Sequence, residues 1–192
     1  MISSLWRRQI LPFFLVLGLL AIAALSGDFV LHQFNLVWIG RYLGIPGTLL
    51  IILSLIYSLR KRKVFTMGKP KTLLALHEFS AWLGSLFVLI HAGIHFNALL
   101  PWLAIIAMGV NVVSGLVGKL LLDRSRRHVQ SEREEFQVRG LSPSEVEQAL
   151  FLDALTLGAM TQWRKIHIPI FFIFVVLALG HIVSIFLFWG WK

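Results

Sequence analysis

The seven histidines are the residues of this 192-residue chain whose type and spacing point most directly to chemistry. Imidazole binds transition metals and exchanges protons near neutral pH. Cysteine is absent, which excludes disulfides, thiolate metal sites, cysteine-ligated iron–sulfur clusters and covalently attached c-type haem. Metal chemistry in this chain must therefore use histidine, carboxylate or a bound cofactor.

Four of the histidines form two pairs with the same spacing. His77 and His91 are 14 residues apart, and so are His167 and His181. In a helix, 14 residues fall about 40° short of four full turns and rise about 21 Å, so each pair shares one face at two depths. If the two helices run in the same direction across a membrane, His77 lies level with His167 and His91 level with His181.

Two imidazoles that face each other across a gap are the ligands that a b-type haem needs. We therefore expect an inner haem on His77 and His167 and an outer haem on His91 and His181. The alternative is that these histidines form hydrogen bonds across a helix bundle, as polar residues in membranes do. For one lone histidine that alternative is the better one, but two matched pairs favour haem.

Other residues support the haem pattern more weakly. Gly84 lies midway between the two histidines of its helix, where it leaves room for macrocycle edges, or simply allows close helix packing. Haem propionates require cations at the membrane surfaces. The candidates are Lys71, Arg164 and Lys165 for the inner haem and Arg41 for the outer haem, although all four also suit ordinary interfacial positions.

His95 and Glu78 have open roles. His95 lies one turn beyond His91 and is an alternative outer ligand, but the equal spacing of the two pairs favours His91. His95 is then left for a propionate, proton or quinone contact. Glu78 is the acid well inside an apolar stretch, either as a proton carrier for a quinone or as a carboxylate paired with a nearby cation. His32 and His128 are expected in loops.

The composition determines which elements carry these side chains. Hydrophobic residues make up 57% of the chain and charged residues 14%, against about 25% charged in a soluble domain. Apolar stretches of about 20 residues predict membrane-spanning helices. Five are expected, at 10–26, 37–59, 72–96, 99–122 and 166–189, in a single all-α domain. The first resembles a secretory signal peptide but is expected as a retained span.

The positive charge predicts the orientation. With the N-terminus in the cytoplasm and the C-terminus outside, 16 of the 18 basic residues fall on the cytoplasmic side. The net charge of +9 is then a topology signal, so nucleic-acid binding is not expected, whereas contact with anionic membrane lipid is. We expect a bacterial inner membrane protein.

One hydrophilic cytoplasmic segment, residues 123–163, separates the fourth and fifth stretches. Ser142, Pro143 and Glu145 form a helix-start pattern, with a capping serine, proline at the first position and glutamate three residues after the cap. The helix that follows is expected to be amphipathic, with Val146, Leu150, Leu157 and Met160 among polar residues. It would lie at the membrane interface or under a partner subunit.

The four-histidine pattern resembles that of the dihaem b-type membrane cytochromes, and most closely the ferric reductase-like transmembrane family. That resemblance, over residues 72–189, implies two haems between the third and fifth spans. Cytochrome b of the quinol–cytochrome c reductases is similar in this spacing, but its Pro-Glu-Trp-Tyr motif is absent here. The family's sixth span and its flavin and nicotinamide domain have no counterpart in this sequence.

The sequence therefore predicts a dihaem cytochrome b that passes electrons across a membrane to or from a partner redox protein. Such a chain would be an electron-transfer component of an oxidoreductase, without its own flavin or nicotinamide domain. One alternative is a quinone-reactive membrane anchor of a larger oxidoreductase, similar to five-span dihaem anchor subunits. The other is a haem-free membrane scaffold or transporter.

Overall fold

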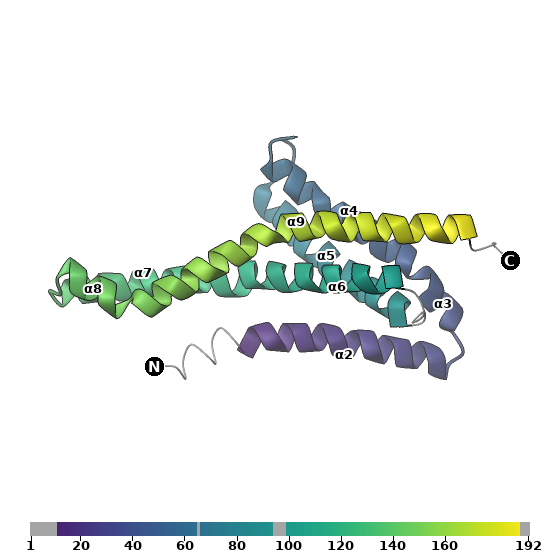
Figure 1. Cartoon of the computed structure of the whole chain (residues 1–192), viewed down its shortest axis with the longest axis horizontal. Helices are drawn as coiled ribbons and strands as arrows, with labels where there is room; N and C mark the ends of the chain where they lie inside the picture. Colours follow the sequence, from purple (N-terminus) through teal and green to yellow (C-terminus); the bar gives the residue numbers. More distant parts are fainter. Residues whose placement is uncertain (1–10, 65, 94–98, 189–192) are drawn as a thin grey trace. The chain divides into compact units, whose positions relative to one another are not determined.

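The computed structural model describes residues 11–64, 66–93 and 99–188, and this part of the chain contains helices and turns but no strand. The predicted all-α class is therefore confirmed (Figure 1). The elements are α2 (Leu11–Gln33), α3 (Val37–Tyr42), α4 (Gly44–Lys61), α5 (Pro70–Gly93), α6 (Leu99–Leu116), the π-helical η2 (Val117–Leu122), α7 (Asp123–Val138), α8 (Pro143–Ala149) and α9 (Phe151–Phe188).

Several of these helices are long and strongly apolar. By length and composition, five described stretches are able to cross a membrane: Leu11–Gln33, Val37–Lys61, Pro70–Gly93, Leu99–Leu120 and Thr161–Phe188. No more than 28% of the most apolar window of any of them is buried within the protein. Apolar side chains exposed to this extent suit lipid rather than water, so the chain has the character of an integral membrane protein.

The first apolar helix is longer than the sequence predicted. Its expected end was Ser26, but α2 continues to Gln33 because Phe29, Val30 and Leu31 extend the apolar run past Asp28. The prediction that His32 lies in a loop is therefore wrong, since this residue belongs to the last turn of α2.

The hydrophilic segment is also more helical than expected. His128 was expected in a loop, but it lies within α7. The helix start at Ser142 is confirmed, because Ser142 and Glu145 form a reciprocal capping box at the start of α8. The helix that begins there, α8, ends at Ala149, and positions Leu157 and Met160, expected on the same helix, belong to α9, which continues into the last apolar stretch.

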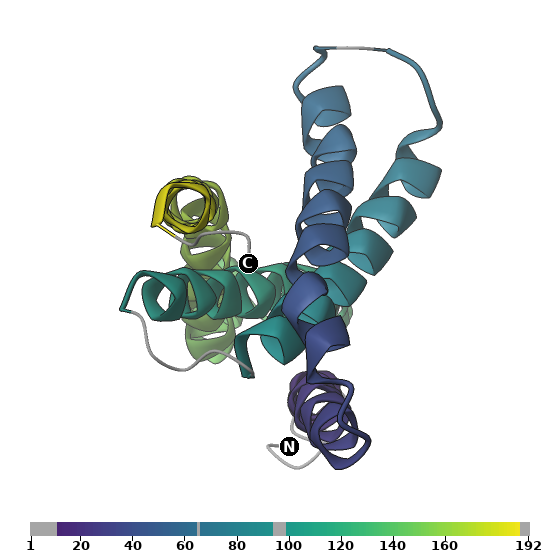
Figure 2. The ribbon, with the colours of Figure 1, turned by 90° about the vertical axis from the view of Figure 1, so that its right-hand side faces the viewer.

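The chain divides into two compact units. One contains the chain up to Leu17 together with residues 109–173, where η2 runs directly into α7 and α7 contacts α8. The other contains residues 18–108 and 174–192. In this second unit α4 and α5 form a closely packed hairpin (Figure 2). Their connection joins the C-terminal end of α4 to the N-terminal end of α5.

Three helices end with a residue in the left-handed backbone region. These residues are Asn35 after α2 (φ 55°), Lys63 after α4 (φ 61°) and Gly140 after α7 (φ 79°). In each case the next residue donates its N–H to a carbonyl five residues back, as Val64 does to Leu59 at 3.1 Å. Glycine and asparagine tolerate this conformation, but a lysine there costs about 1 kcal/mol of strain.

Candidate haem site

The imidazole rings of His91 and His181 lie together in the second unit. His91 is near the end of α5 and His181 is in the last part of α9, and their ring centroids are 6.4 Å apart. Two imidazoles on opposite sides of one metal, with bonds of about 2.0–2.1 Å and nitrogen roughly 1.15 Å from each ring centre, have centroids about 6.3–6.5 Å apart. The observed separation therefore fits one metal atom between the two rings.

The angle between the two ring planes is 54°. Imidazoles that share a metal would be able to rotate about their bonds to it, so this angle does not conflict with shared ligation.

The orientation of the His91 ring is fixed by the main chain of α3. Its Nδ1 lies 3.2 Å from the carbonyl oxygen of Gly40. A carbonyl oxygen only accepts hydrogen bonds, so Nδ1 carries the hydrogen and the lone pair of the neutral ring is on Nε2. This arrangement is the usual one for a metal-binding histidine, in which the nitrogen that does not bind metal donates to a carbonyl or carboxylate.

Gly44 makes room for the same ring. A Cβ atom at this position would lie 3.0 Å from Cδ2 and 3.1 Å from Nε2 of His91. Such contacts are closer than ordinary van der Waals distances, so a side chain here would push the imidazole away. The first residue of α4 thus helps to set where the His91 ring lies.

His77, 14 residues earlier on α5, makes the same kind of hydrogen bond as His91. Its Nδ1 donates to the carbonyl oxygen of Ser54 at 2.8 Å, which again leaves the lone pair on Nε2. The ring of Tyr57 lies beside it, with 5.6 Å between ring centroids. Both histidines of α5 are therefore held in the same tautomer by the preceding α3–α4 segment.

His167 belongs to the other unit, so its pairing with His77 stays a prediction. Within its own unit, His167 on α9 faces α6. A Cβ atom at Gly115 would lie 3.9 Å from its Cε1, which is an ordinary van der Waals contact. The sequence offered no matching glycine on the helix of His167 itself.

Gly84 packs α5 against α4 in the structure. A Cβ atom there would lie 2.9 Å from the carbonyl oxygen of Gly47 and 2.9 Å from Cγ1 of Ile51. Two glycines thus allow the backbones of the two helices to approach closely, which is the packing interpretation of Gly84. Its predicted place at a macrocycle edge has no contact to support it and stays a prediction.

The remaining candidates lie both at helix ends and inside helices. Lys71 at the start of α5, Lys165 on α9 and Arg41 in the last turn of α3 are exposed, and Glu78 is half-buried beside His77. The backbone of Arg164 is helical, but its side chain is outside the described part, and His95 lies outside the described residues altogether.

One polar pair was missed by sequence reasoning. Asp28 on α2 has its carboxylate at 3.4 Å from Nδ1 of His32, and a Cβ atom at Gly93 would lie 3.0 Å from its Cγ. The carboxylate therefore packs on the end of α5, two residues beyond His91. The aspartate–histidine spacing of four residues was a usable signal, but the early expected end of α2 hid it.

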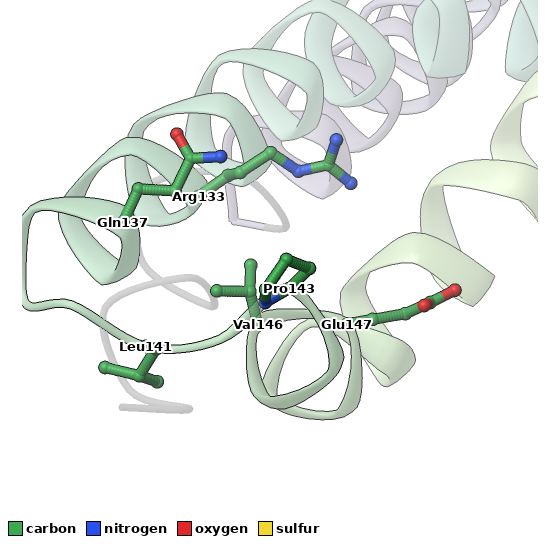
Figure 3. A pocket seen from close by; sticks show the side chains of 6 residues that line it. All are labelled: Arg133, Gln137, Leu141, Pro143, Val146 and Glu147. Carbon is green, nitrogen blue, oxygen red and sulfur yellow. The ribbon is translucent and has the colours of Figure 1, made fainter.

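No three histidine, aspartate or glutamate side chains cluster tightly enough in the described ranges to hold a bare metal ion. Haem iron needs only two protein ligands, since the macrocycle supplies the others. A hollow of about 320 Å³ between α7 and α8 is lined by residues that include Arg133, Val146 and Glu147 (Figure 3).

The comparisons with known proteins add no neighbour to this picture. No protein-family model, no curated protein and no solved structure matches the chain.

Proposed function

We propose that this protein is an integral membrane cytochrome b that binds two b-type haems and passes single electrons between the two faces of the membrane. The observation that carries this proposal is the 6.4 Å separation of the His91 and His181 rings, which matches two axial ligands of one iron. The tautomer of His91, with its lone pair on Nε2, supports the same role.

The four histidines have separate tasks in this proposal. His91 and His181 hold the outer iron, and His77 and His167 hold the inner iron. When bound, haem supplies one-electron chemistry through its iron. Hydrogen bonds from Nδ1 to the carbonyls of Gly40 and Ser54 orient the α5 rings and make Nε2 a stronger donor to the metal.

The distribution of charge supports a defined orientation in the membrane. In the proposed topology of five spans, the N-terminus is cytoplasmic and the C-terminus is outside, most simply in a bacterial inner membrane. This places 16 of 18 basic residues on the cytoplasmic side, where anionic lipids attract them. Electrons then enter or leave at the inner haem through a partner redox protein or subunit, since the sequence contains no Gly-rich dinucleotide fingerprint.

A reduced-minus-oxidised spectrum of the purified protein, with a haem count per chain, tests the proposal. We expect the spectrum of a bis-histidine cytochrome b and two haems per chain. Absence of b-type haem after expression with adequate haem supply would overturn the proposal and favour a haem-free membrane scaffold.

Single substitutions assign the ligands. His91→Ala and His181→Ala are each expected to leave one haem per chain. The spectra of the two variants should be the same, because both substitutions remove a ligand of the same iron. His77→Ala and His167→Ala are expected to remove the other haem. His32→Ala is the matched control, because His32 is exposed and belongs to neither pair, and it should retain two haems.

A quinone-reactive anchor subunit is the second candidate function. It is favoured by Glu78, a half-buried carboxylate next to His77 in sequence, which would exchange a proton with a reduced quinone in this function. Inhibitor-sensitive reduction of the haems by a quinol analogue, lost in Glu78→Gln, would support this function. Reduction that is insensitive to inhibitor and unchanged in Glu78→Gln would rule against it.

A further inference from the structure

The turn between α4 and α5, residues 60–71, concentrates positive charge in a way that the rest of the chain does not. It contains six basic residues, and the sequence has no acid anywhere between Asp28 and Glu78. The other large hydrophilic segment, from Asp123 to Lys165, holds seven basic and seven acidic residues and is therefore neutral overall. The turn is thus the main source of net charge in the hydrophilic segments.

The cations of this turn are accessible. Lys61, Arg62, Lys63, Lys69 and Lys71 are exposed, and none of these five forms an ion pair with any part of the protein that the structure describes. Two apolar side chains lie among them and are also exposed, Val64 at 67% and Met67 at 81%. An apolar centre surrounded by charge is the usual arrangement of a small protein–protein interface.

Lys63 carries a positive charge at a position where the backbone conformation favours glycine. Lys63 has φ 61° and closes α4 with the same hydrogen-bond pattern that Asn35 and Gly140 give to α2 and α7. Glycine would satisfy that backbone without strain. A strained lysine at an exposed turn suggests that its side chain contacts another molecule rather than stabilising the fold.

The turn is also close to the proposed inner haem ligand. Lys71 precedes His77 by six residues on α5, a rise of about 9 Å along the helix. A redox protein docked on the turn would therefore have its cofactor within reach of the inner haem, whereas a lipid headgroup bound there would contribute nothing to electron transfer. This location favours a protein partner over lipid.

We infer that residues 60–71, the basic turn, form the docking site for a soluble electron carrier whose surface is acidic around its redox group. This inference rests on the proposed cytochrome function. A haem held by His77 and His167 would take up one electron from the reduced carrier, which is oxidised by one electron, with no bond formed or broken. Opposite charges steer such encounters and speed association by factors of about 10–1000 at low salt.

The test uses the haem-loaded full chain and reduced flavodoxin, a small acidic flavoprotein, as the probe. The second-order rate of haem reduction is followed by stopped-flow at ionic strengths of about 0.01 M and 0.15 M, where the screening length falls from about 30 Å to about 8 Å. The wild-type rate is expected to fall steeply with salt. The variant Lys61→Gln, Arg62→Gln, Lys63→Gln should be about tenfold slower or more at low salt, with a weaker salt dependence.

Two controls isolate the position of the charge. Arg127→Gln, Arg133→Gln, Arg139→Gln removes the same number of cations from α7 and the residue that follows it, and should leave the rate close to wild type. Reduced riboflavin, which lacks a protein surface and carries at most one charge, should reduce the wild type and both triple variants at similar rates.

A single substitution separates docking from stability. Lys63→Gly should raise the thermal midpoint, because it removes strain, yet slow reduction by flavodoxin. Asn35→Gly makes the corresponding change after α2 and should leave that rate unchanged. The comparison of Lys63→Gly with Asn35→Gly therefore tests the docking site even if the triple variant folds poorly.

Equal flavodoxin rates in the wild type and the basic-turn variants would overturn the inference. The inference would also be overturned if the basic-turn variants differed from the wild type only in how much anionic lipid they retain. The turn would then bind lipid headgroups and not a redox protein. Equilibrium binding of flavodoxin is measured on the same preparations by fluorescence. Loss of haem with intact, salt-sensitive binding would therefore count against the cytochrome function and not against the docking site.

Discussion

His77 donates its Nδ1 hydrogen to the carbonyl oxygen of Ser54, 23 residues earlier in the chain, at 2.8 Å. His91 makes the equivalent bond to Gly40 on the segment before it. The α3–α4 segment thus holds two imidazoles of α5 at two depths, each with its Nδ1 bonded to a backbone carbonyl. A ligand helix oriented in this way is prepared for metal before the metal binds.

Gly44→Val is expected to weaken the outer haem site selectively. A side chain at position 44 meets the His91 ring at about 3 Å, so the imidazole must move away from its place opposite His181. The variant should lose most of one haem while it keeps the other, as measured by pyridine haemochrome assay and by redox titration. Gly18→Val is the control, since no atom lies within 4 Å of a Cβ there, and it should bind two haems.

Gly84→Ala is expected to lower stability and affect both haems. The added methyl would lie 2.9 Å from the backbone oxygen of Gly47, so α4 and α5 must separate. Overpacking of this kind costs about 1–3 kcal/mol. Thermal unfolding in detergent should show a lower midpoint, together with weaker binding of both haems because α5 carries a ligand of each.

Gly109→Ala is the matched control for Gly84→Ala. A Cβ at position 109 meets nothing within 4 Å, and alanine is the better helix former, so this variant should be as stable as wild type or more stable. Equal midpoints for the two alanine variants would contradict the packing role of Gly84.

His95→Ala is expected to keep two haems, in contrast to His91→Ala. The reason is geometric, because the ring that lies at a ligand distance from His181 is that of His91. Haem content and the spectrum of each variant measure the difference. Loss of the outer haem in His95→Ala alone would assign the outer ligand to His95 instead.

Ser142→Ala is expected to raise the pKa of Glu145. The hydroxyl of Ser142 donates to the Glu145 carboxylate at 2.7 Å and the Ser142 N–H donates at 2.8 Å, and these bonds hold the pKa of that carboxyl below its usual value. Carboxyl chemical shifts followed by NMR during a pH titration measure the change. Replacement of Glu147, which is outside the capping box, should leave the pKa of Glu145 where it is.

The same capping box makes the start of α8 sensitive to acid. Because the pKa of Glu145 is lowered by folding, its contribution to α8 is fully present above the unfolded pKa and is lost as pH falls through the folded pKa. Amide exchange at the start of α8 should therefore speed up in that acidic range. Ser142→Ala should remove most of this pH dependence.

Much of the helical framework follows from the sequence alone. Long apolar runs must form helices in lipid, because no water is present to satisfy the backbone, and this determined the all-α class. The helical period placed His77 and His91 on nearly one face without knowledge of any neighbour. The capping box at Ser142 was readable for the same reason, since all of its groups lie within four residues.

Two features were decided only by the tertiary structure. Every residue has a carbonyl oxygen, so no sequence pattern marks Ser54 and Gly40 as the acceptors for His77 and His91. The 6.4 Å between His91 and His181 joins residues 90 positions apart, and such a distance depends on how helices pack rather than on any local property of the chain.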